Sequence, residues 1–188
     1  MEPFSQADEP VDYEAQYAVN PGPPLLLHSN RVFSVLYDGN SHFIEYNVCD
    51  EGAIVVPRFA NGDFLLVQLQ RAPAFGMSTE FPRGGVDHGE APVHGGLREL
   101  REETGYRAQI DSVTYLGRLG GDTAALNHVG HVFLVDIPED AIPSDYDKTE
   151  IAGHLRVAPE QLKQMVKDNL IVDGYTLAAL GMLYARLR

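Results

Sequence analysis

Three glutamates lie within a segment of five residues that the surrounding pattern predicts to be helical: Glu99, Glu102 and Glu103. The helix is expected over about residues 91–104, because apolar residues recur there at helical spacing and Gly105 stands where a C-terminal cap belongs. Positions three and four apart are neighbours on a helix, so the three carboxylates share one face. Like charges at this spacing destabilise a helix by about 0.2–0.5 kcal/mol per pair. The segment therefore needs positive charge beside these side chains.

The sequence offers two sources for that charge. Arg98 and Arg101 flank the glutamates and would offset part of the repulsion on an ordinary solvated helix face. A bound divalent cation is the other source, since ions such as Mg²⁺ prefer carboxylate oxygens as ligands. The loop before the helix decides between these two explanations.

A regular pattern of residues runs from that loop into the helix. It consists of Gly84, Glu90, Arg98, Glu99, Leu100, Glu102, Glu103, Gly105 and Tyr106. The pattern resembles the signature of the Nudix hydrolase family, G-x5-E-x7-R-E-U-x-E-E-x-G-U with U apolar or aromatic, and it matches at every specified position. Members of this family hydrolyse a diphosphate linkage with the help of divalent metals, so the resemblance implies Mg²⁺ or Mn²⁺ as cofactor.

The resemblance also implies a role for each residue of the pattern. The metal ligands are expected to be Glu99, Glu102, Glu103 and the backbone carbonyl of Arg83, which directly precedes the motif glycine. A second set is expected to hold the loop and the helix in place without contacting the metal: Gly84, Glu90, Arg98 and Gly105. Within this set, Glu90 and Arg98 lie eight positions apart and are expected to pair across the loop.

Outside the motif the chain resembles the ADP-ribose pyrophosphatase branch of the family. The spacing E-x-P-x-G-x4-G-E is met from Glu80 to Glu90, and the similarity extends over roughly residues 31–188. The resemblance implies that Arg71 contacts a substrate phosphate and that Glu80 orients either a metal-bound water or the loop. Arg83 stands where the branch has a small residue, and its side chain is expected to reach a phosphate or a sugar.

The catalytic base has three candidates. In this branch the base often comes from an acidic loop before a late strand, and here that loop contains Glu150 and, as an alternative, Asp147. Glu103 is the third candidate, because other branches use this position directly. A base must reach the attacking water, and spacing alone does not show which carboxylate does so.

The expected fold is the Nudix α/β/α sandwich, with a mixed sheet between helices and an N-terminal β extension. Strands are expected as a hairpin within 31–48, then at 52–59, 63–70, 112–119, 129–136 and 150–157, with a loop at 72–85 and later helices within 158–169 and 173–188. We expect three regions: a flexible arm at 1–23, a dimerising β subdomain at 24–50 and a catalytic domain at 51–188. The resemblance implies a homodimer.

Composition narrows the range of partners. The formal net charge is −13, and no cluster of Lys and Arg is present to neutralise a nucleic-acid backbone. No apolar run is long enough to span a bilayer, so no membrane partner is expected. The single cysteine, Cys49, excludes an internal disulfide and fits a reducing, cytoplasmic location. A small phosphorylated molecule remains the expected partner, because bound cations reverse the local charge.

The expected reaction is metal-dependent hydrolysis of a nucleoside diphosphate-linked compound, with ADP-ribose or a nucleotide sugar as the leading substrate. The products would be a nucleoside monophosphate and a sugar phosphate. Two alternatives stay open: a Nudix enzyme for a dinucleotide or a nucleoside triphosphate, and a sensor that binds ADP-ribose without turnover.

Overall fold

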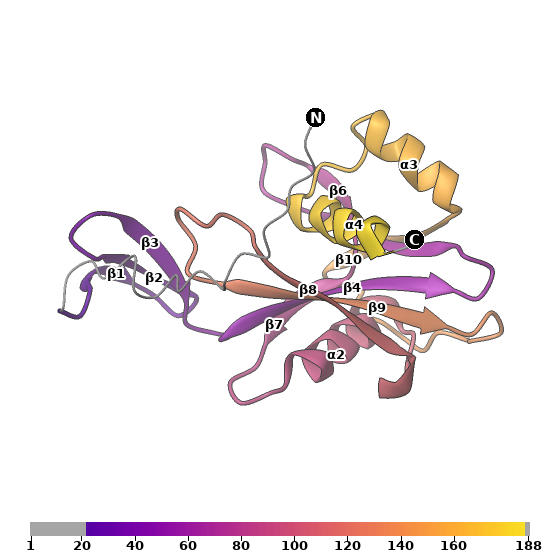
Figure 1. Ribbon diagram of the computed structural model, residues 1–188, viewed down its shortest axis with the longest axis horizontal. Helices are drawn as coiled ribbons and strands as arrows, with labels where there is room; N and C mark the ends of the chain where they lie inside the picture. Colours follow the sequence, from indigo (N-terminus) through magenta and orange to yellow (C-terminus); the bar gives the residue numbers. More distant parts are fainter. Residues whose placement is uncertain (1–21, 187–188) are drawn as a thin grey trace, which may run out of the picture.

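The computed structural model describes residues 22–186, so nearly all of the arm predicted at 1–23 lies outside the described residues. A three-stranded antiparallel sheet comes first and stands to one side of the main body (Figure 1). It consists of β1 (Leu25–Ser29), β2 (Phe33–Tyr37) and β3 (His42–Tyr46). The predicted hairpin is confirmed as β2 and β3, whereas β1 was not predicted. The proposed division of the chain near residues 23 and 50 stays a prediction.

The main sheet has seven strands and is mixed, as predicted. Its strands are β4 (Glu51–Phe59), β5 (Phe64–Gln70), β6 (Met77–Glu80), β7 (Arg83–Val86), β8 (Val113–Gly120), β9 (Val129–Ile137) and β10 (Ile151–Val157). The order is β10-β5-β4-β9-β8, with β6 paired to β5 and β7 paired to β4. The β4–β9 pair is parallel and the other pairs are antiparallel.

Helices cover both faces of this sheet. The helical segments are α2 (Pro92–Thr104), the short 3₁₀ turn η1 (Ile110–Ser112), α3 (Pro159–Lys167) and α4 (Gly174–Arg186). Successive side chains of a strand point to opposite faces, and β4 shows this directly. Ala53 and Val55 pack in the core layer beside α2, while Ile54 and Val56 pack in the layer beside α3 and α4. Figure 1 shows α2 on one side of the sheet and α3 and α4 on the other, which confirms the predicted α/β/α sandwich.

The prediction of a loop over residues 72–85 is wrong in part, because β6 and most of β7 lie within it. Both strands are four residues long and lack a clear apolar alternation. They exist because each pairs with a longer strand: Ser78 lies opposite Leu69 of β5, and Gly84 opposite Ala53 of β4. Local pattern gives no sign of this pairing, because four-residue strands without apolar alternation carry little signal of their own.

The first sheet meets the main body through the loop that precedes β9. The backbone N–H of Ile44 donates to the carbonyl of Ala125 at 2.8 Å, and the N–H of Asn127 donates back to the carbonyl of Ile44 at 2.9 Å. This short parallel bridge places Tyr46 beside His128, with 4.9 Å between ring centroids. Among the helices of residues 22–186, none is long and apolar enough to cross a membrane.

Candidate active site

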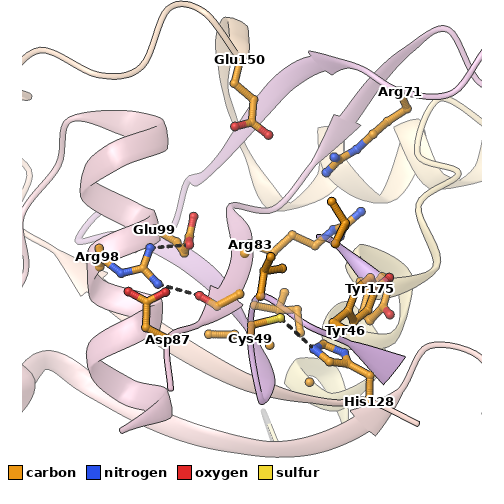
Figure 2. A pocket seen from close by; sticks show the side chains of 18 residues that line it. Tyr46, Cys49, Arg71, Arg83, Asp87, Arg98, Glu99, His128, Glu150 and Tyr175 are labelled. Atoms are coloured by element: carbon orange, nitrogen blue, oxygen red, sulfur yellow. Dashed lines mark hydrogen bonds and ion pairs between the residues drawn. The ribbon is translucent and has the colours of Figure 1, made fainter. Parts of the chain in front are cut away.

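A cavity of about 460 Å³ opens where the first sheet, β4, β7 and α2 converge. Figure 2 shows three kinds of side chain around it. Carboxylates lie on one side, guanidinium groups lie beside them, and aromatic rings close the far corner. In that order the principal members are Glu99 and Glu150, then Arg71 and Arg83, then Tyr46, His128 and Tyr175. The cavity therefore combines acidic, basic and aromatic surfaces within reach of one small molecule.

Two largely buried carboxylates of α2 lie at the acidic side: Glu99 lines the cavity, and Glu103 is buried near it without lining the cavity. Burial raises the pKa of Glu99, and the charges of Glu102 and Glu150 add to this effect, against the opposing influence of Arg98. Glu103 is 6% exposed, and burial together with Glu99 and Glu150 raises its pKa to about 8. Glu102, by contrast, turns outward and its side chain is 42% exposed. The repulsion anticipated from the sequence is therefore concentrated at Glu99 and Glu103.

Arg98 lies at the centre of the contacts between the loop and α2. Its Nη2 donates to the carbonyl of Gly85 at 2.6 Å and to Glu90 at 3.1 Å. Its Nη1 donates to Glu99 at 2.6 Å and to Glu102 at 3.3 Å. One guanidinium thus ties the loop carrying Gly85 and Glu90 to the glutamate face of the helix.

The two motif glycines, Gly84 and Gly105, occupy places where any side chain would collide with neighbouring atoms. A Cβ at Gly84 would lie 2.2–2.4 Å from the carboxylate atoms of Glu99, so β7 passes this close to α2 only because residue 84 has no side chain. Gly105 ends α2 in the left-handed region, with φ of 77°, and its N–H donates to the carbonyl of Arg101. A Cβ at Gly105 would also collide with the backbone of Ser144.

The donor set fits a hard divalent cation. Glu99 and Glu103 are held close together in a largely buried place, where a cation would relieve their repulsion. The N–H of Arg83 donates to Glu103 at 3.1 Å. Because the N–H and C=O of one strand residue point to the same side, the Arg83 carbonyl faces the same region. As placed, no three Asp, Glu, His or Cys side chains of residues 22–186 converge on a single point, since Arg98 draws Glu99 and Glu102 toward itself.

The basic side contains two arginines that share one buried carboxylate. Arg71 donates to both oxygens of Glu80, through Nε at 2.9 Å and Nη2 at 2.6 Å. Arg83 donates to Glu80 through Nε at 3.2 Å. Burial alone would raise the pKa of Glu80, but the bonds from Arg71 and the charge of Arg83 hold it below its ordinary value. Glu80 is therefore the ionised counter-ion of both arginines.

The guanidinium groups keep donors available for a ligand. Within residues 22–186, Nη1 of Arg71 and Nη1 of Arg83 have no hydrogen-bond partner. Both side chains line the cavity, and each is about a quarter exposed, at 29% and 24%. Paired guanidinium N–H groups are suited to phosphate oxygens.

The aromatic corner was not anticipated from the sequence. Tyr46 comes from β3, His128 from the loop before β9, and Tyr175 from the first turn of α4. Burial lowers the pKa of His128, which favours the neutral imidazole. Its Nε2 lies 3.9 Å from Sγ of Cys49. These residues are separated by up to 129 positions and share no motif, so only the fold brings them together.

The candidates for the catalytic base are in different positions. Glu150 lines the cavity, and its charge contributes to the raised pKa of both Glu99 and Glu103. The carboxylate of Asp147 instead accepts hydrogen bonds from the backbone N–H and the hydroxyl of Thr149, at 2.8 and 2.5 Å. Asp147 is also absent from the cavity lining.

The chain is similar to several known proteins. A family model described as NUDIX domain matches residues 50–178. The chain is 28% identical over 136 residues to an ADP-ribose pyrophosphatase of Bacillus subtilis (strain 168), covering 70% of this chain and 71% of that protein. It is 25% identical over 134 residues to a methanol dehydrogenase activator of Bacillus methanolicus, with the same coverage of 70% and 71%.

The crystal structure of an ADP compounds hydrolase has a similar fold. It aligns with a TM-score of 0.67 at 19% identity, and the alignment covers 88% of this chain and 95% of that one. An identity this low supports the fold alone. A shorter match, 44% identical over 46 residues, links 24% of this chain to 21% of an ADP-sugar pyrophosphatase of Mus musculus.

Proposed function

Because the chain belongs to the Nudix family, as a pyrophosphohydrolase of the ADP-ribose pyrophosphatase branch, we propose that it hydrolyses nucleoside diphosphate-linked compounds. ADP-ribose or a nucleotide sugar is the proposed substrate. Water adds across the P–O–P linkage: its oxygen joins one phosphorus, and the bridging oxygen leaves with the other. The products are a nucleoside monophosphate and a sugar phosphate.

One observation carries this proposal: the order of surfaces along the cavity. Carboxylates for a metal lie beside Arg71 and Arg83, and the rings of Tyr46 and Tyr175 follow (Figure 2). A nucleoside diphosphate has the same order of groups, since a metal-bound diphosphate connects to a planar base. Aromatic side chains stack on such rings, and guanidinium groups bind the phosphates.

The proposed metal is Mg²⁺ or Mn²⁺, held by Glu99, Glu102, Glu103 and the carbonyl of Arg83. When bound, such an ion neutralises the diphosphate oxygens and lowers the pKa of water. Glu102 would have to exchange its contacts with Arg98 and Arg101 for the ion.

We propose Glu150 as the residue that takes the proton from the attacking water. Its carboxylate faces the cavity across from Arg71 (Figure 2) and is solvent-exposed, so it can accept and then release a proton. Its loop is anchored on the end of α2, where the N–H of Asp147 donates to the carbonyl of Glu102 at 2.8 Å. We therefore assign Asp147 to stabilising the loop and not to proton transfer.

The test is release of phosphomonoester from a panel of ADP-ribose, ADP-sugars, other nucleotide sugars, dinucleotides and nucleoside triphosphates. The panel is run with Mg²⁺, with Mn²⁺ and with a chelator. We expect turnover of ADP-ribose or a nucleotide sugar that the chelator abolishes. Glu103→Gln should lose nearly all turnover, while Glu160→Gln, an exposed glutamate of α3, should keep it. Retained activity in Glu103→Gln would contradict the metal role of that side chain.

The same panel decides between the remaining alternatives. Preference for a dinucleotide or a nucleoside triphosphate would replace the proposed substrate and leave the chemistry unchanged. Binding of ADP-ribose with no product under any metal condition would make the protein a sensor. We favour the enzyme because all the motif glutamates are present.

We further propose that the enzyme is a homodimer that works in the cytoplasm. Three adjacent leucines of β1 are exposed by 61%, 57% and 48%: Leu25, Leu26 and Leu27. An apolar edge strand of this kind is ordinarily covered by another surface. A second copy is the proposed cover, and sedimentation equilibrium should give twice the chain mass of 20.7 kDa.

A further inference from the structure

Asp173 makes two separate sets of contacts with its two carboxylate oxygens. Its Oδ2 accepts hydrogen bonds from the backbone N–H and the hydroxyl of Thr176, both at 2.8 Å. Its backbone carbonyl accepts from the N–H of Leu177 at 3.0 Å, so Asp173 is the N-cap of α4. Its Oδ1 instead accepts from Nη2 of Arg83 at 3.2 Å. The cap uses one oxygen and leaves the other for Arg83.

The contact with Asp173 helps to hold the Arg83 side chain, together with the contacts to Glu80 and Tyr175. The guanidinium carbon lies 4.7 Å from the ring centroid of Tyr175, which follows Asp173 by two positions. The other anionic partner of Arg83 is Glu80, at 3.0 Å, and Glu80 is already bound at both oxygens by Arg71. Asp173 is therefore the carboxylate that Arg83 does not share with Arg71.

The same helix terminus also holds the backbone between Glu80 and Arg83. The hydroxyl of Thr176 accepts a buried hydrogen bond from the N–H of Phe81 at 2.9 Å. The side chain of Asp173 is 10% exposed, so its bond to Arg83 is largely protected from solvent. Two contacts from the start of α4 thus fix the turn between β6 and β7 and the arginine that follows it.

We propose that Asp173 is a positioning residue for the substrate, and that it acts by holding the Arg83 guanidinium over Tyr175 and toward the phosphate side of the cavity. This inference rests on the proposed function, because it assigns Arg83 to substrate phosphate. Asp173 and Arg83 therefore form a pair that supplements Arg71 in binding substrate.

The test uses a substitution that separates the cap from the ion pair. Asn caps helices as well as Asp, so Asp173→Asn should keep α4 and the thermal unfolding midpoint close to those of the wild type. Its amide has no charge to hold Arg83. We expect KM for ADP-ribose, or for the best substrate of the panel, to rise about 10- to 150-fold, which is the range for one lost hydrogen bond to a charged group, with kcat within about twofold. Asp173→Ser also caps but cannot reach Arg83, and it should give the same result.

A double-mutant cycle with Arg83→Ala excludes a general structural effect. If Asp173 acts through Arg83, then Asp173→Asn should leave KM unchanged when Arg83 is already alanine. Equal effects of Asp173→Asn in both backgrounds, or an unchanged KM in the single variant, would overturn the inference. A wild-type protein that hydrolyses nothing in the panel would instead overturn the proposed function, so the two failures are distinguishable.

Discussion

Replacing Gly84 by alanine should displace the Glu99 carboxylate while leaving the free energy of unfolding nearly unchanged. The new Cβ would lie 2.2 Å from the carboxyl carbon of Glu99. Ordinary contact between carbon atoms is about 3.5 Å, so the carboxylate must withdraw by about 1.3 Å. The backbone at Gly84 is not in the left-handed region, so alanine itself causes no strain there.

The expected loss of stability is small, whereas the expected loss of catalytic rate is large. The displaced group is the end of a flexible side chain, and an altered rotamer costs only about 0.5–1.5 kcal/mol. A shift of about 1 Å in a group that positions the reacting atoms can lower the rate by about 100-fold. We therefore expect Gly84→Ala to fold with a slightly reduced free energy of unfolding and to lose at least about 100-fold in kcat/KM.

The assay is phosphomonoester release under saturating Mg²⁺, measured beside urea unfolding of the same preparations. Gly181→Ala is the matched control, because nothing lies within 4 Å of its new Cβ in the middle of α4. That control should keep full activity and gain about 1 kcal/mol of stability from helix propensity. Full activity in Gly84→Ala would refute the reasoning, since it would show that the Glu99 carboxylate is not needed at its observed place.

Two further substitutions test the remaining parts of the site. Glu150→Gln should lower kcat by about 10²–10⁴-fold with little change in KM, because a general base acts in the chemical step. An unchanged rate in single-turnover measurements would exclude Glu150 as the base. Glu80→Gln should destabilise the protein by about 1–3 kcal/mol in urea unfolding and raise KM, because it removes the charge that holds Arg71 and Arg83. An unchanged KM would show that the two arginines do not need this charge to bind substrate.

Local sequence pattern was sufficient for the longer elements of the fold. The buried strands β4 and β5 are near-continuous apolar runs, and α2 combines an apolar face with a terminal glycine. Periodicity reports which face of an element is buried, and in these elements burial dominates the stability. The strands β6 and β7 lacked such a signal, because each is only four residues long and pairs with a longer strand. The strand β1 does contain an apolar run, but its leucines are exposed rather than part of the core.

The candidate site also contains residues that the sequence identified and residues that only the structure distinguishes. The glutamates of α2 were identifiable because their spacing lies within one short motif, where helix geometry alone sets their relative positions. The proposal of Glu150 over Asp147 as the base rests on the structure, since both are acidic residues of one loop, but Glu150 lines the cavity and Asp147 bonds Thr149. Residue type therefore gave the kind of chemistry but not the direction in which a loop side chain points.

The sequence by itself determined the carboxylate face of α2, because helix geometry sets the spacing within one continuous segment. The motif that contains this face resembles the family, and the α/β/α architecture was expected from that resemblance. Only the tertiary structure decided that Arg71 and Arg83 share Glu80, that Asp173 reaches Arg83 from α4, and that Tyr46 and Tyr175 meet at one cavity. These contacts join residues up to 129 positions apart. They form only when strand pairing and helix packing bring distant segments together. Spacing along a short segment therefore does not predict them.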